Sequence, residues 1–75
     1  MRHKRPEVSP GAHLYASMDA IDGSRWSVRL CLAGQEPGPW CKRMSPPFDL
    51  QMTAWNWLAW ANGEVDAFEY PAGVA

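Results

Sequence analysis

Two stretches of alternating apolar and polar residues dominate the first half of the chain. The apolar members of the alternation are Leu14, Ala16, Met18, Ala20, Trp26, Val28, Leu30 and Leu32. A period of two is the pattern of a strand that buries one face and exposes the other. Residues 12–33 therefore predict two half-buried strands.

The turn between these strands decides which side chains share a face, because a shift of one residue moves every side chain to the opposite side. A two-residue Asp22-Gly23 turn would split the apolar residues between the two faces. A three-residue loop over 21–23, with Gly23 left-handed in a bulge, keeps them together. We therefore predict a bulged hairpin in which Leu14 lies opposite Leu30.

The second half of the chain predicts one helix between Asp49 and Gly63. Asp49 suits the N-cap position, and Asn62-Gly63 suits a left-handed stop. With residues placed about 100° apart, one stripe of the helix is formed by Leu50, Ala54, Trp57, Leu58 and Ala61. We expect this stripe to pack against the apolar face of the hairpin.

Three further segments complete the predicted fold. Residues 40–44 fit a short third strand, and residues 64–70 fit a last strand whose alternation is disturbed. Residues 1–11 are basic and contain prolines without either period, which predicts a flexible arm ahead of a single domain over 12–75. The sequence therefore predicts a small α+β domain of ββ(β)αβ order, with the helix on one face of an antiparallel sheet.

The predicted helix lacks a charged face, since no residue from 50 to 62 carries a charge. A helix on the surface of a globular protein normally has a polar or charged face opposite its apolar stripe. The uncharged side chains that lie away from the core stripe or flank it are Met52, Trp55, Asn56, Ala59 and Trp60. Two interpretations stay open. Trp60 and Trp55 could fold sideways under the proline-rich loop or the predicted C-terminal strand, or the stripe could bind a partner.

The second interpretation rests on the kinds of residue involved. Tryptophan is enriched among the residues that dominate binding energy at interfaces, and methionine adapts its shape to a partner. The candidate partner-binding residues are therefore Met52, Trp55, Asn56 and Trp60, joined by Trp40.

Length and composition limit the classes of protein that fit. A chain of 75 residues with 47% hydrophobic content can build one modest core. A membrane span needs about 20 consecutive apolar residues, and the sequence has no run of that length. A signal peptide would place an apolar segment after the basic first residues, and the sequence shows none there. Two cysteines are few for a secreted protein of this size. We expect a cytoplasmic protein with reduced thiols and no membrane association.

Few residues offer catalytic or metal-binding chemistry. In the predicted register His13 lies opposite Cys31, but nothing identifiable orients the histidine or supplies an oxyanion site. A zinc site drawn from His3, His13, Cys31 and Cys41 lacks a closely spaced ligand pair. The sequence predicts a non-enzymatic protein with no catalytic residue, bound metal or cofactor.

A second candidate surface lies on the polar face of the hairpin. Tyr15, Arg25 and Arg29 share that face, and an aromatic ring beside arginines can stack on the bases of a single strand. The chain nevertheless has eight acidic residues against seven basic ones and a net charge of −1, which opposes strong attraction to phosphates. Single-stranded nucleic acid is therefore the weaker expectation.

No sequence motif ties the chain to a family. A small single-domain α+β chain with an uncharged helix and no catalytic set nevertheless resembles inhibitory proteins carried by phages and mobile elements, such as anti-CRISPR proteins. The resemblance implies an inhibitor that binds a larger host protein complex and blocks it by steric occlusion. The alternatives are a homodimer that pairs the same helix face about a two-fold axis, and a single-stranded nucleic-acid-binding protein.

Overall fold

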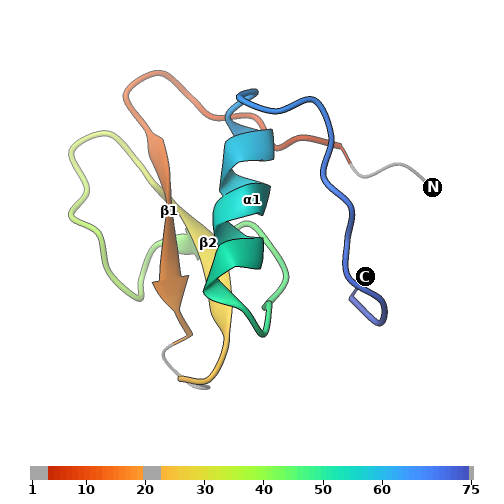
Figure 1. The fold of residues 1–75 in the computed structure, drawn as a ribbon. Helices are drawn as coiled ribbons and strands as arrows, with labels where there is room; N and C mark the ends of the chain where they lie inside the picture. Colours follow the sequence, from red (N-terminus) through yellow and green to blue (C-terminus); the bar gives the residue numbers. More distant parts are fainter. Residues whose placement is uncertain (1–3, 20–22, 75) are drawn as a thin grey trace.

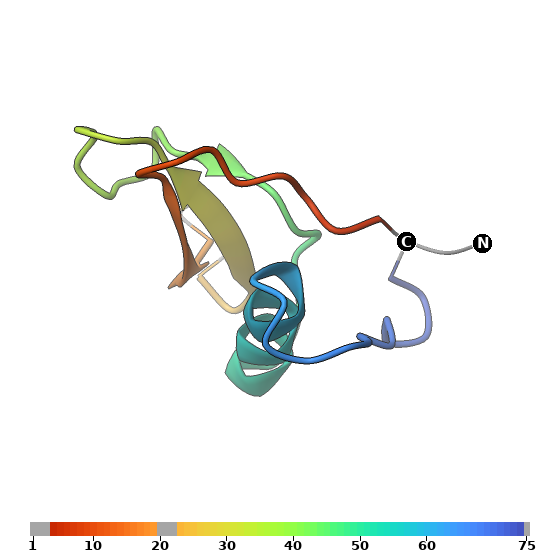
Figure 2. The same cartoon turned by 90° about the horizontal axis from the view of Figure 1, so that it is seen from above.

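The computed structural model describes residues 4–19 and 23–74. Over these residues the chain forms the strands β1 (His13–Met18), β2 (Trp26–Cys31) and β3 (Lys42–Arg43), and the helix α1 (Gln51–Ala61). The strands make one antiparallel sheet in the order β1-β2-β3, and α1 lies across one face of it (Figure 1, Figure 2). The predicted α+β class, one helix on a small antiparallel sheet, is confirmed.

The hairpin has the predicted register. β1 pairs with β2 so that Leu14 lies opposite Leu30 and Met18 lies opposite Trp26. The apolar side chains therefore share the face that meets α1, where Val28 is completely buried. Residues 21 and 22 of the predicted bulged turn lie outside the described part of the chain.

The third strand is shorter than the predicted range of 40–44. After β3 the chain continues beside β2 and makes an isolated bridge in which Trp26 and Phe48 exchange backbone hydrogen bonds of 2.7 and 2.6 Å. Between β3 and this bridge stand Pro46 and Pro47, which have no backbone N–H to contribute to a ladder. The prolines thus interrupt the pairing and leave β3 with two residues.

The core lies between α1 and the sheet. Its buried apolar residues are Leu14, Val28, Phe48, Ala54, Trp57, Trp60 and Ala61. Most of the predicted helix stripe faces this core, with Leu58 partly buried. The prediction for Leu50 was wrong, because its side chain is 66% exposed. Leu50 precedes the helix with an extended backbone (φ −112°, ψ 137°), so helical spacing does not apply to it.

The two ends of α1 differ in how well the sequence predicted them. Asp49 is not the N-cap: Leu50 holds that position, and no side-chain hydrogen bond caps the helix in the described structure. The Asp49 carboxylate instead lies 3.7 Å from Nε of Arg25. At the other end Asn62 is the C-cap and Gly63 has φ of +79°, so the left-handed glycine stop is confirmed.

The predicted last strand is wrong, since residues 64–70, all of them described, form no strand. This C-terminal segment leaves the end of α1 and runs away from the sheet, where no strand lies beside its backbone (Figure 1, Figure 2). Phe68 and Tyr70 pack on Phe48, with ring centroids 5.8 and 6.3 Å away, whereas Val65 and Ala67 are exposed. The aromatic pair therefore fixes the segment by side-chain packing without strand pairing.

From residue 4 onward, where the structure describes the N-terminal arm, Arg5 and Val8 contact the folded domain. Arg5 donates from Nε to the backbone oxygen of Trp60 at 2.8 Å and from Nη2 to that of Val65 at 3.0 Å. Its guanidinium also lies 5.7 Å from the centre of the Trp60 ring. Val8 packs against the core. Nothing in the sequence pattern indicated these contacts.

Candidate partner-binding surface

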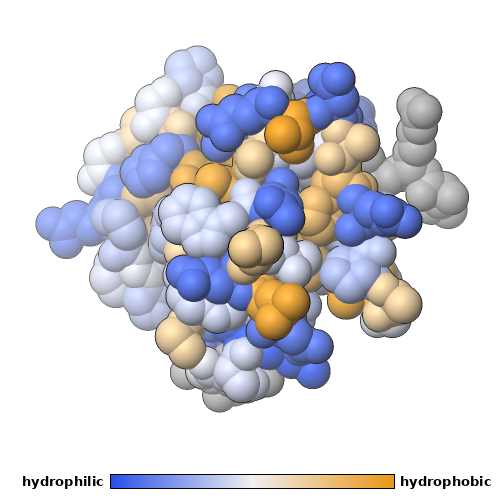
Figure 3. Space-filling model, viewed as in Figure 1, coloured by the Kyte–Doolittle hydropathy of each residue, from blue (hydrophilic) through white to orange (hydrophobic). Residues whose placement is uncertain are grey.

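The outer face of α1, defined here as Met52, Trp55 and Asn56, points away from the sheet. Met52 is 72% exposed and Trp55 is 53% exposed, and Asn56 is also exposed. Figure 3 views the molecule from the side of α1 and shows apolar side chains interspersed with hydrophilic ones. Because α1 carries no charged residue, this face combines exposure with an apolar character that surface helices seldom have.

Trp60 does not belong to this surface. Its side chain is only 6% exposed, so the expectation that it is available beside Trp55 was wrong. The ring packs against Trp57 and Phe68, with centroids 5.7 and 6.1 Å away, and Arg5 lies over it. The interpretation that Trp60 folds sideways and is covered is therefore confirmed, although the covering C-terminal residues form no strand. Trp55 stays exposed.

Two open grooves border the outer face. One of about 450 Å³ lies between α1 and the C-terminal segment, and its lining includes Asn56, Thr53 and Phe68. The other, of about 480 Å³, lies near the start of α1 and includes Leu50 and Thr53. Since Thr53 contributes to both, the grooves are neighbours along one side of the helix. The sequence did not predict them, because the expected last strand would have placed the C-terminal segment in the sheet.

Four acidic residues are exposed just before and after α1. Asp49 is exposed just before α1, and Glu64, Asp66 and Glu69 are exposed after it. Glu69 also lines the groove that contains Asn56. Acidic residues are therefore exposed near both ends of α1, and Arg25 lies beside Asp49 at the first of them.

Trp40 is exposed but lies elsewhere. Its side chain is 63% exposed, and its indole Nε1 donates to the backbone oxygen of Glu36 at 2.9 Å. The ring lies against Gly38, where an added Cβ would come within 2.3 Å of it. The loop that carries Trp40 is on the far side of the sheet from α1 (Figure 2). The structure therefore does not bring Trp40 together with the outer face.

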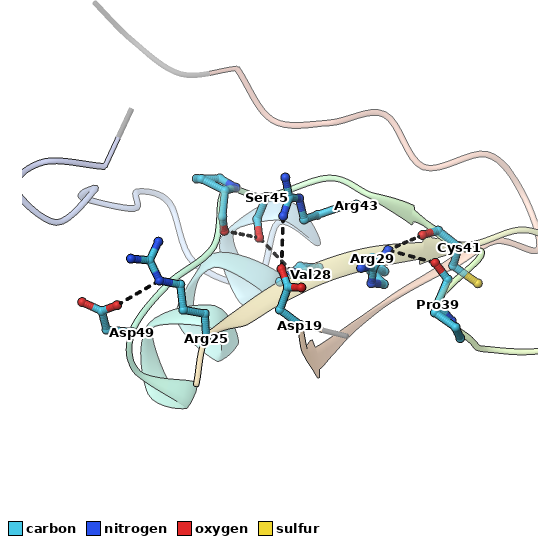
Figure 4. A network of polar contacts seen from close by, with 10 residues as sticks. Asp19, Arg25, Val28, Arg29, Pro39, Cys41, Arg43, Ser45 and Asp49 are labelled. Atoms are coloured by element: carbon cyan, nitrogen blue, oxygen red, sulfur yellow. Dashed lines mark hydrogen bonds and ion pairs between the residues drawn. The ribbon is translucent and has the colours of Figure 1, made fainter. Parts of the chain in front are cut away.

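The second candidate surface is partly covered by that same loop. Tyr15 and Arg29 lie opposite each other and line a groove of about 300 Å³ with residues 37–39. The Tyr15 hydroxyl donates to the Gly38 oxygen at 3.0 Å. Arg29 Nη1 donates to the Cys41 oxygen at 2.7 Å, as Figure 4 shows. The proline-containing loop therefore folds back over part of this polar face and leaves Tyr15 and Arg29 half-buried. Arg25 is separate, near Asp49.

The chemistry of single residues adds little to these surfaces. His13 lies opposite Cys31 as predicted, yet His13 is exposed while Cys31 is completely buried. In the part of the chain that the structure describes, no cluster of three or more histidine, cysteine or acidic side chains could hold a metal ion. Nor is any described helix long and apolar enough to traverse a bilayer.

In comparisons with protein-family models, curated proteins and solved structures, nothing matches the chain.

Proposed function

We propose that the protein is a small binding module that docks a protein partner on the outer face of α1. The observation that carries the proposal is the exposure of Met52 and Trp55, 72% and 53%, on a helix without charge. A contiguous exposed apolar surface on a small protein commonly marks an interaction site. Truncating a tryptophan at the centre of such a site costs about 2 kcal/mol or more of binding energy.

The surroundings of the face suggest the chemistry of the partner. The exposed carboxylates after α1, Glu64, Asp66 and Glu69, favour a basic surface on the partner, whereas Asp49 is paired with Arg25. The bordering grooves can receive side chains that project from the other protein. The partner we propose therefore has an apolar pocket for Trp55 with lysine or arginine residues near it.

Steric occlusion is the mode of action that this surface supports. A module with no catalytic set can act by covering the surface that it binds, and the resemblance to anti-CRISPR proteins extends this to inhibition of a larger complex. That extension rests on the resemblance alone, whereas the proposal of a protein-binding face rests on Met52 and Trp55. A homodimer through the same face is the main competing outcome.

Substitution of Trp55 by Asp tests the proposal, with Trp40→Asp as the matched control. Trp40 has a similar exposure but lies on the far side of the sheet. Each tagged protein is used to capture partners from a cell lysate, and the affinity for the recovered protein is then measured. We expect Trp55→Asp to weaken binding at least about 30-fold and Trp40→Asp to leave it nearly unchanged.

Circular dichroism and urea unfolding show whether the variant still folds. A substitution on an exposed face should change the free energy of unfolding by no more than about 1 kcal/mol. If Trp55→Asp unfolds the protein, Trp55 belongs to the core and the proposed surface does not exist. Equal capture by the folded Trp55→Asp variant and the wild type would also refute the proposal.

A further inference from the structure

The pairing of β2 with β3 places the two cysteines opposite each other. Arg29 pairs with Arg43 and Leu30 pairs with Lys42, so the next position of the same antiparallel register sets Cys31 against Cys41. Residues directly opposite in an antiparallel pair have Cα atoms about 4.5–5.5 Å apart. That separation lies inside the roughly 4.4–6.8 Å over which a disulfide joins two Cα atoms.

The side chains point to the same place. The Cys31 thiol donates to the backbone oxygen of Gln35 at 2.8 Å, and the Cys41 thiol donates to that of Glu36 at 3.7 Å. Since these two oxygens belong to consecutive residues of one loop, both sulfurs lie beneath that loop. Both cysteines are free thiols, and their exposed fractions are 0% and 2%.

We infer that Cys31 and Cys41 form a cross-strand dithiol that exchange with a small disulfide, such as oxidised glutathione, converts into an intramolecular disulfide. The product would fasten the loop over residues 32–40 to the sheet. This inference is independent of the proposed partner-binding face, which lies on the other side of the sheet.

The two thiols have different roles in this exchange. Burial raises the pKa of Cys41, but hydrogen bonds from the Tyr15 hydroxyl, the Gly38 backbone and the Cys31 thiol, with the charge of Arg29, outweigh it and lower the pKa overall. Burial is the main cause that raises the pKa of Cys31. The thiolate is the attacking species in exchange, so Cys41 is the first nucleophile.

The reaction balances with one equivalent of oxidised glutathione. The Cys41 thiolate attacks one glutathione sulfur, which forms a mixed disulfide and releases the first glutathione thiolate. The Cys31 thiolate then attacks the Cys41 sulfur and releases the second. Two electrons pass from the cysteines to the glutathione disulfide, and the two thiol protons end on the two reduced glutathione molecules.

The loop controls access to the sulfurs. It is held closed by hydrogen bonds, among them the one between Tyr15 and Gly38 and another from the Leu32 N–H to Oε1 of Gln35 at 3.1 Å. Because both thiols are buried, the loop has to open before glutathione can reach Cys41. Once the disulfide forms, the same loop is held closed covalently.

Mass spectrometry of the native protein in glutathione buffer tests the inference. Trypsin cleaves after Arg29 and Lys42, so both cysteines fall in the single peptide Leu30–Lys42. After alkylation of remaining thiols, we expect this peptide to lose the mass of two hydrogen atoms and to carry neither alkyl group nor glutathione. We also expect the thermal unfolding midpoint of the oxidised protein to rise by several degrees, because the closed loop restricts the unfolded chain.

The variant Cys31→Ser isolates the first step. It retains Cys41 and should accumulate a stable mixed disulfide with glutathione, which the wild type resolves. The inference is overturned if native wild type stays reduced in oxidised buffer while the urea-unfolded chain oxidises. It is equally overturned if the wild type ends as a glutathione adduct or a disulfide-linked dimer. Both outcomes are read from the wild type alone, so they hold even if the variant does not fold.

Discussion

The tryptophans of α1 show how contacts with distant residues decide the role of a side chain. Trp55 and Trp60 both lie off the predicted core stripe, yet one is 53% exposed and the other 6%. Trp60 lies only about 60° around the helix from Trp57, and the C-terminal segment and Arg5 cover it. Helical spacing could predict that Trp57 is buried and that Trp55 points outward. It could not predict the cover over Trp60, which comes from residues near both ends of the chain.

The indole N–H of Trp57 gives a prediction at the residue scale. It donates to the Tyr70 hydroxyl at 2.9 Å, and Trp57 is only 2% exposed. Tyr70→Phe removes this acceptor and leaves the N–H unpaired in the core. We expect a loss of about 1–3 kcal/mol in the free energy of unfolding, measured by urea denaturation.

A double-mutant cycle separates this hydrogen bond from other effects of the hydroxyl. In a Trp57→Phe background there is no N–H to leave unpaired, so Tyr70→Phe should cost clearly less than in the wild type. Equal costs in the two backgrounds would mean that the hydrogen bond contributes little to stability.

At the scale of elements, local pattern predicted the hairpin and the helix but failed at the ends of the chain. The parity of alternation and the short loop together favoured the register that pairs Leu14 with Leu30, because a shift of one residue would expose the apolar side chains. The C-terminal segment has no such constraint. The rings of Phe68 and Tyr70 are partly removed from solvent by packing against Phe48, and this packing requires no neighbouring strand.

The contact between the N-terminal arm and the rest of the fold gives a prediction about an element. Arg5→Ala removes hydrogen bonds to the backbone oxygens of Trp60, Val65 and Asp66, together with the cation over the Trp60 ring. We expect a loss of about 1 kcal/mol in unfolding free energy, moderated because the site is largely exposed to solvent.

Hydrogen exchange supplies the element-level readout for this variant. The amides of residues 64–68 should exchange faster in Arg5→Ala than in the wild type, because the segment loses its tie to the arm. Lys4→Ala, at an exposed neighbouring position, is the control and should stay within about 0.5 kcal/mol of the wild type. Identical behaviour of the two variants would show that the arm does not hold the segment.

For the molecule as a whole, the sequence predicted the fold class and the three exposed residues of the outer face, Met52, Trp55 and Asn56. An uncharged helix with one apolar stripe already implies that Met52 and Trp55 face away from the sheet. The grooves beside α1 and the covering of Tyr15 and Arg29 were not predictable, because both depend on where long loops fold back. The result is a domain whose apolar helix face and buried dithiol lie on opposite sides of one sheet.

Molar mass by light scattering over a concentration series tests the central claim, that the outer face of α1 is free to bind another protein. We expect the mass of the monomer, 8.4 kDa, for both the wild type and Trp55→Asp throughout the series. A wild type that doubles its mass while Trp55→Asp stays monomeric would contradict the claim, because the face would then be occupied by a second copy of the chain.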